Sequence, residues 1–126
     1  RGPIGNVIIS NVELTTNQGC KVMIPHGNMN VKFLYYFFKI SGEELNTLGQ
    51  GTTFLELSTT SLSMFKVNLP PIFEQTQIVE YLDEQTQKID STIEKETQRI
   101  ELLKEYRQSL ISEVVTGKID VRDWKV

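Results

Sequence analysis

Two polar loops contain the side chains that are best suited to hydrogen-bonding a ligand. Thr15-Thr-Asn-Gln18 and Gln50-Gly-Thr-Thr53 present amides and hydroxyls. Asn or Gln can form two hydrogen bonds with adenine and Arg can do so with guanine, so these residue types fit the base edges of DNA. The same types also satisfy the backbone of tight turns, and that structural role is an open alternative. The candidate contact residues are Arg1, Thr15, Thr16, Asn17, Gln18, Gln50, Thr52 and Thr53.

Basic side chains are unevenly distributed along the chain. The net charge of −3 argues against nucleic-acid binding, because domains of that kind usually present a basic surface to phosphates. Residues 1–70, however, contain five Lys or Arg against four acids, whereas residues 71–126 contain eight against twelve. We therefore expect any phosphate contact in the first part of the chain. The candidates there are Arg1, Lys21, Lys32 and Lys66, although scattered cations also occur simply as a solvated surface.

Catalytic chemistry has little support in the sequence. His26 has no evident nucleophile beside it, and Cys20 lies several positions from any candidate base, so an ordinary surface histidine and a buried thiol are favoured. Methyltransferases position a target amine with an Asp or Asn directly before a pair of prolines. In Asn68-Leu-Pro-Pro71, Leu69 separates the asparagine from the prolines, so this arrangement is missing. We expect no enzyme activity, no cofactor and no metal.

The sequence shows neither a secretory nor a membrane signal. A lone cysteine, Cys20, cannot form an internal disulfide. The longest apolar-rich stretch, Val31–Ile40, holds two lysines, which is incompatible with a transmembrane helix. Arg1–Gly5 has neither an initiator methionine nor the charged and apolar regions of a signal peptide. These features predict a fragment or a processed chain of a cytoplasmic protein without a membrane span.

The first seventy residues favour a small mixed domain, and thus an α+β fold class. Asn30 can cap a helix over Val31–Ile40, in which phenylalanines recur at helical spacing, and a second short helix is expected near Glu43–Leu48. Short β-branched or apolar runs bounded by turn residues predict strands at Asn6–Leu14, Cys20–Ile24 and Phe65–Leu69.

A long helix is predicted after Pro70-Pro71, a pair that removes two backbone donors and marks a boundary. From Phe73 to Val115 neither Gly nor Pro occurs, and eight of eleven core positions of a seven-residue repeat are apolar. The three polar core positions, Thr86, Glu96 and Arg107, either fix the register of a coiled coil or lie exposed where the packing drifts. A small domain cannot cover so long a stripe, so we expect a partner helix. The predicted helix–helix interface consists of Val79, Leu82, Ile89, Ile93, Ile100, Leu103, Leu110 and Val114.

The predicted division of the chain is therefore a partial domain at 1–71, a coiled-coil helix at 72–116 and a tail at 117–126. Gly117 suits the left-handed cap that ends many helices. In the tail, apolar residues stand at near-alternate positions. We expect Trp124 to dock against the protein for stability, with a contact to a partner as the open alternative.

A series of motifs resembles the C-terminal end of type I specificity subunits. They are Leu69-Pro-Pro-Ile-Phe-Glu-Gln75, Ile78, Tyr81-Leu-Asp83, Ile89-Asp90, Leu103-Lys-Glu-Tyr-Arg107 and Val115-Thr-Gly-Lys-Ile-Asp120. Upstream, three segments look like the latter half of that family's target recognition domain, namely Arg1-Gly-Pro-Ile-Gly5, Thr16-Asn-Gln18 and Gly49-Gln-Gly-Thr-Thr53. The resemblance covers nearly the whole chain.

The resemblance implies a DNA specificity subunit of a type I restriction and modification complex. Its recognition domain would read one half-site of double-stranded DNA. Its long helix would pack antiparallel against a second one, supplied by another specificity half or by a second copy of the chain. Methyltransferase (modification) subunits, and through them the restriction subunit, would carry methylation and cleavage, with Tyr81 and Tyr106 as candidate contacts of the methyltransferase subunits.

A competing hypothesis is a coiled-coil assembly module that does not bind DNA. The overall negative charge favours it slightly. The resemblance also places the start of a complete recognition domain before Arg1, which puts DNA binding by this chain alone in doubt.

Overall fold

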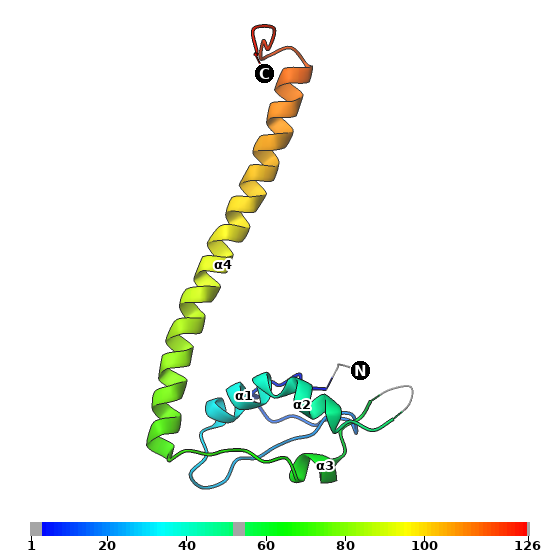
Figure 1. The fold of residues 1–126 in the computed structure, drawn as a ribbon, viewed down its shortest axis with the longest axis vertical. Coiled ribbons are helices and arrows are strands. Elements are labelled where there is room, and N and C mark those ends of the chain that lie inside the picture. Colours follow the sequence, from blue (N-terminus) through cyan, green and yellow to red (C-terminus); the bar gives the residue numbers. More distant parts are fainter. Residues whose placement is uncertain (1–3, 52–54, 126) are drawn as a thin grey trace. The chain divides into compact units, whose positions relative to one another are not determined.

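The structure, a computed structural model, describes residues 4–51 and 55–125. Within these residues, four helices follow one another along the chain: α1 (Val31–Ile40), α2 (Gly42–Thr47), α3 (Thr59–Ser63) and α4 (Ile72–Val115) (Figure 1). The chain divides into two units, Arg1–Leu82 and Asp83–Val126. The first unit contains α1 to α3 and the first turns of α4, together with both predicted loops.

Helix α1 begins and ends where the sequence predicts. The side-chain oxygen of Asn30 accepts hydrogen bonds from the backbone nitrogens of Lys32 and Phe33, at 2.9 and 3.2 Å, and so caps the first turn. Ser41 ends the helix, and its hydroxyl donates to the carbonyl of Phe37 at 2.8 Å. Helix α2 follows directly and buries Leu45, which confirms the second short helix.

A small aromatic core holds the first unit together. Phe38 of α1 is 4% exposed, and its ring centroid lies 5.9 Å from that of Phe65, which follows α3. Phe37 lies 6.2 Å from the same ring. Aromatic pairs at such distances contribute about 0.5–1.5 kcal/mol beyond the burial of their area. Phe65 thereby ties α1 to the chain that leads toward α4.

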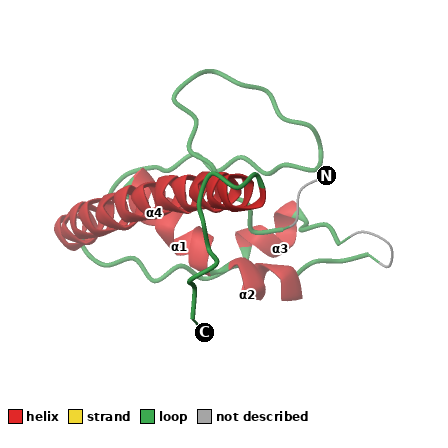
Figure 2. Cartoon of the chain, turned by 90° about the horizontal axis from the view of Figure 1, so that it is seen from above, coloured by secondary structure: helices red, strands yellow, loops and turns green. Residues whose placement is uncertain are grey.

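The three predicted strands are wrong. Figure 2 shows helices and loops, and β pairing in the described ranges is limited to one bridge between Gln50 and Glu56. Asn6–Leu14 and Cys20–Ile24 form no ladder, and apolar side chains along them lie in solvent, Ile8 being 83% exposed. Their β-branched residues favour extended backbone, but a strand forms only where a neighbour supplies donors and acceptors. The described fold is mostly helical, and the α+β class is not confirmed.

Helix α3 is an element that the sequence analysis missed. The hydroxyl of Ser58 accepts a hydrogen bond from the backbone nitrogen of Ser61 at 2.9 Å, so a regular N-cap precedes the helix. Serine is among the preferred capping residues, and a local signal was therefore present. After α3, residues 65–69, the third predicted strand, are irregular and lead into the proline pair.

Gln75 fixes the first turns of α4 to the rest of the first unit. The side chain is 1% exposed. Its amide nitrogen donates to the carbonyls of Asn28 and Pro70, at 3.1 and 2.7 Å, and its amide oxygen accepts from the backbone nitrogen of Asn30 at 2.8 Å. Burying an amide is tolerated when its hydrogen bonds are made, as they are here. One turn later, Val79 is also buried.

Helix α4 ends in a Schellman motif. Gly117 has a φ of 76°, the backbone nitrogen of Lys118 donates to the carbonyl of Glu113 at 2.8 Å, and that of Gly117 donates to the carbonyl of Val114 at 3.1 Å. These two bonds satisfy carbonyls that the helix leaves unpaired. Both the long helix and its left-handed glycine cap are thereby confirmed.

The tail after Gly117 is a short irregular segment. Trp124 is 78% exposed and therefore does not pack within its own unit. Its docking elsewhere stays a prediction. In the part of the chain that the structure describes, no helix combines the length and the apolar character needed to cross a membrane.

Candidate nucleic-acid and helix interfaces

The first candidate loop is a turn that Asn17 stabilises itself. The side-chain oxygen of Asn17 accepts a hydrogen bond from the backbone nitrogen of Gly19 at 3.0 Å, and its carbonyl accepts one from Cys20 at 3.1 Å. This is the structural role that Asn commonly has in turns. The arrangement uses one acceptor of the side chain. The turn leaves four side chains exposed, those of Thr15, Thr16, Asn17 and Gln18. Residues that contact DNA bases must be exposed when no DNA is bound.

A cation stands beside this loop. The ammonium of Lys21 donates to the carbonyl of Gln18 at 2.7 Å, which holds it next to the exposed amides. A positive charge here is suited to a phosphate, and phosphate contacts fix the register of a DNA-binding loop. A hydrogen bond thus holds Lys21, one of the four predicted phosphate contacts, beside the exposed turn at Asn17.

The second candidate loop is closed by a two-residue β bridge. The backbone nitrogens and carbonyls of Gln50 and Glu56 exchange two hydrogen bonds, both 2.9 Å long. This bridge pins the ends of the connection and leaves Gln50 exposed. Thr52 and Thr53 of the same loop, and also Arg1, lie outside the described residues. The hydrogen bonds of the Gln50 bridge lie within its own loop, and so do those of the Asn17 turn. These bonds do not join one loop to the other.

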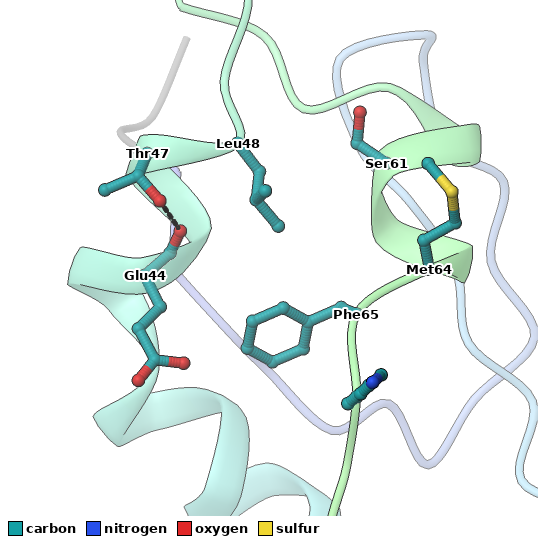
Figure 3. Close-up of a pocket in the computed structure, with 7 residues that line it drawn as sticks. Glu44, Thr47, Leu48, Ser61, Met64 and Phe65 are labelled. Carbon is teal, nitrogen blue, oxygen red and sulfur yellow. Dashed lines mark hydrogen bonds between the residues drawn. The ribbon is translucent and has the colours of Figure 1, made fainter.

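An open hollow of about 420 Å³ lies between the end of α2 and α3. Figure 3 shows Leu48 and Phe65 pointing toward each other across it, while the hydroxyl of Thr47 donates to the carbonyl of Glu44 at 2.6 Å. Lys66, a predicted phosphate contact, lines the same hollow and is exposed. Its lining combines polar and apolar side chains, and an open hollow of this kind reflects imperfect packing around Phe65.

Cys20 and His26 are the two side chains for which the sequence raised the question of reactivity, and both lie at the surface. Cys20 is exposed, so the expectation of a buried thiol is wrong. His26 is exposed, as expected for a surface histidine. Over the described ranges, no group of three or more His, Cys, Asp or Glu side chains is placed to hold a metal ion.

The predicted helix interface separates into two parts. Val79 is 5% exposed and Leu82 is partly buried, so both pack within the first unit. Val114 is partly buried near the helix end. Farther along α4 the apolar core positions are open to solvent, namely Ile89, Ile93, Ile100, Leu103 and Leu110. Tyr81 and Tyr106 are exposed as well.

The tail carries an ion pair between two residues that are two positions apart, Asp120 and Arg122. The guanidinium of Arg122 contacts the carboxylate of Asp120 at 2.6 Å through Nη2 and at 3.0 Å through Nε. The Arg122 side chain, and secondarily its backbone N–H, lowers the pKa of Asp120, and the carboxylate raises the pKa of Arg122. Both groups are exposed, so the pair organises the tail locally.

Gln75 belongs to the motif Leu69-Pro-Pro-Ile-Phe-Glu-Gln75, and no role was predicted for it from the sequence. In sequence it resembles its neighbour Gln77, which is exposed. The burial of Gln75 depends on which face of the first turn of α4 packs against residues 28–30. That packing is a tertiary contact. The apolar Val79 one turn later is the only local hint of the buried face.

Comparison with known proteins gives the family. Residues 1–104 match the family described as the type I restriction modification DNA specificity domain. The chain therefore belongs to this family.

Several curated relatives are similar over most of this chain. It is 35% identical over 105 residues to the MjaIX specificity subunit of Methanocaldococcus jannaschii, a match that covers 82% of this chain and 23% of that one. It is 33% identical over 107 residues to the EcoR124I/EcoR124II specificity subunit of Escherichia coli, with 80% and 26% covered. The EcoBI specificity subunit of Escherichia coli is 29% identical over 110 residues, with 87% and 23% covered. The chain thus spans about a quarter of the length of these relatives. No solved structure matches it.

Proposed function

We propose that this chain is part of the DNA-reading component of a type I restriction and modification complex and contributes to the recognition of one half-site of double-stranded DNA. The match of residues 1–104 to the DNA specificity domain carries this proposal. The names of the relatives support it, because each is called a specificity subunit of a type I restriction enzyme. In this role the chain is not catalytic, and partner subunits modify and cleave the DNA.

The turn at Asn17 is the proposed reading element, and Lys21 is its phosphate anchor. The Asn17 amide nitrogen remains available for a base edge, because the hydrogen bond to Gly19 uses the side-chain oxygen. The Lys21 ammonium next to Gln18 supplies the positive charge that fixes the loop on the backbone. Gln50, and with it Arg1, Thr52 and Thr53, belong to the same proposed surface.

The proposed functional division follows the proline pair, with recognition by residues 1–71, spacing by a coiled coil at 72–116 and a tail at 117–126. The exposed apolar positions of α4 support an antiparallel pairing with a second such helix, from another specificity half or a second copy. Methyltransferase subunits, and through them the restriction subunit, would dock near this helix. The exposure of Tyr81 and Tyr106 is compatible with that contact.

Fluorescence anisotropy with a pool of random-sequence duplexes, at about 50 and about 200 mM salt, tests DNA binding by the chain. Binding that weakens with salt is expected. Lys21→Ala should weaken it at both salts and reduce the slope of log affinity against log salt by about one. Lys125→Ala, which removes a lysine of the tail, is the matched control and should leave the slope unchanged. No binding at either salt would leave the assembly-module hypothesis in place.

Base reading by Asn17 needs a separate test. Asn17→Ser keeps an oxygen acceptor for the turn and removes the amide donor. Repeated selection from the random pool should enrich a defined sequence with the original chain, and Asn17→Ser should lose the preference at one position while retaining overall binding. An unchanged preference would assign Asn17 to the turn alone.

A further inference from the structure

The segment at Ile4 and Gly5 passes helix α2 at very close range. Gly5 has a φ of 96°, and a Cβ placed on it would lie 2.8 Å from the Cα of Gly42, the first residue of α2. Both the backbone conformation and the short separation require glycine at position 5. The passage brings the carbonyl of Ile4 within hydrogen-bonding distance of the last turn of α2.

Asn46 joins this segment to α2 through its side chain. The amide nitrogen donates to the carbonyl of Gly42 at 2.8 Å and to that of Ile4 at 3.3 Å. These two bonds use both hydrogens of the amide. Asparagine is a poor helix former, so helix propensity does not account for its place in a helix of six residues. The bond to Ile4, 42 positions away in the sequence, is a tertiary contact that supplies a reason.

The residue that follows α2 toward the second candidate loop, Gly49, is held by the same group of contacts. Its backbone nitrogen donates to the carbonyl of Asn46 at 3.0 Å. A Cβ at position 49 would lie 2.8 Å from Cδ1 of Ile4 and 3.2 Å from the Cβ of Leu55, so the Ile4 side chain occupies the space beside this glycine. The Ile4 segment, the end of α2 and the chain that enters the loop therefore meet at one point.

The next residue along the chain is Gln50, a proposed contact of DNA bases. Its side chain is exposed, and its backbone is paired with that of Glu56 by two hydrogen bonds of 2.9 Å. A side chain that forms paired hydrogen bonds with a base edge must be held within about 0.5 Å of its correct place, usually by a surrounding layer of hydrogen bonds. The bridge to Glu56 fixes Gln50 within its own loop. The contacts of Asn46 and Gly49 relate that loop to α2.

We propose that Asn46 is a positioning residue for base reading by Gln50. The Asn46 amide holds the Ile4 segment against α2, and the Ile4 side chain in turn packs beside Gly49 and sets the path of the chain into Gln50. Asn46 acts through Gln50 and makes no base contact itself, because both of its amide hydrogens are already used. The reading role of Gln50 rests on the proposed function, whereas the coupling of Asn46 to the loop does not.

Hydrogen exchange of individual backbone amides, measured by NMR on the full chain, tests the coupling without DNA. Asn46→Ala should speed the exchange of the Gln50 and Glu56 amides, which form the bridge, by about tenfold or more. The Leu34 amide, which bonds to the carbonyl of Asn30 in α1, is the internal reference and should be unaffected. Asn46→Asp, which keeps the size of the side chain but removes both donors, should give the same result as alanine.

Thr47→Ala is the matched control. The Thr47 hydroxyl also bonds to a backbone carbonyl, that of Glu44, but this contact stays within α2 (Figure 3). Thr47→Ala should leave the exchange of both bridge amides unchanged. Equal acceleration by the two alanine variants would indicate a general loosening of α2 and overturn the proposal. Unchanged exchange in Asn46→Ala, or bridge amides that are already unprotected in the original chain, would overturn it as well.

Selection from the random-sequence pool tests the consequence for DNA reading. Gln50→Ala identifies the base position that Gln50 contacts. Asn46→Ala should lose the preference at this same position, while its overall affinity stays within about threefold and the salt slope is unchanged, since phosphate contacts are retained. Thr47→Ala should keep the preference. A residue that only stabilised the fold would instead lower the affinity for all sequences alike.

The two measurements separate the possible failures. An original chain that binds and selects DNA, with a preference that Asn46→Ala leaves intact, contradicts the positioning role but not the proposed function. An original chain that does not bind DNA contradicts the proposed function, and hydrogen exchange still decides whether Asn46 holds the Gln50 loop.

Discussion

The side-chain oxygen of Gln75 accepts a hydrogen bond from the backbone nitrogen of Asn30 at 2.8 Å, and the side chain of Asn30 in turn caps α1. The two residues are 45 positions apart. Through them, the first turn of α4 is connected to the start of α1. Within the first unit, one buried amide therefore joins the first turn of α4 to the cap of α1.

Replacing Gln75 should destabilise the first unit. Gln75→Leu fills the same space but leaves the carbonyls of Asn28 and Pro70 and the nitrogen of Asn30 without their partner. We expect a loss of about 2–4 kcal/mol in the free energy of unfolding, since unsatisfied buried groups each cost about 1–3 kcal/mol. Urea unfolding followed by circular dichroism measures it. The same replacement at exposed Gln77 is the control, and an equal effect there would refute the special role of Gln75.

The cap of α1 makes a second prediction. Asn30→Ala removes the acceptor for the backbone nitrogens of Lys32 and Phe33 and should cost about 1 kcal/mol, whereas Asn30→Asp should retain most of the stability. Thermal unfolding of the three proteins gives the comparison. Equal stability of the alanine and aspartate variants would show that the cap contributes nothing measurable.

Gly5 stands where the chain passes close to the start of α2. It has a φ of 96°, and a Cβ on it would lie 2.8 Å from the Cα of Gly42. Gly5→Ala should therefore lower the midpoint of thermal unfolding through both backbone strain and steric overlap. Gly27→Ala is the control, because Gly27 also has a positive φ but open space around it. If Gly27→Ala destabilised the protein as much as Gly5→Ala, the close approach would have no energetic consequence.

The ion pair in the tail predicts a pH dependence confined to acid. The neighbouring Arg122 lowers the pKa of Asp120, so the pair forms fully above the ordinary aspartate pKa of about 3.9 and is lost as the pH falls through the lower folded value. NMR titration of the Asp120 carboxyl carbon should show a midpoint below the ordinary one. Arg122→Ala should raise that midpoint to the ordinary value, and Lys125→Ala should not. A midpoint that is the same with and without Arg122 would exclude the pair in solution.

Features with local causes were predictable from the sequence. The cap at Asn30, the second short helix, the unbroken run after Pro71 and the glycine at 117 each depend on a few neighbouring residues, and the structure confirms them. The strands were not predictable, because Ile8 and its neighbours have the composition of a strand but no ladder partner among the described residues. The role of Gln75 depends on contacts far along the chain, and no pattern around it distinguishes it from Gln77.

The candidate site was predicted in part. The Asn17 turn and the open stripe on α4 lie where the sequence analysis expected polar and apolar surfaces. The contact between Lys21 and Gln18 could not be foreseen, because four lysines or arginines were equally eligible by charge alone. Val79 and Leu82 fit the heptad as well as Ile93 does, and only the burial in the first unit separates them from it.

All three partners of the Gln75 amide are main-chain atoms. Side chains at positions 28 and 70 can therefore change without removing a donor or an acceptor from this joint, provided that the backbone keeps its path. Substitutions can therefore accumulate at these positions while the hydrogen bonds that hold the first turn of α4 are retained.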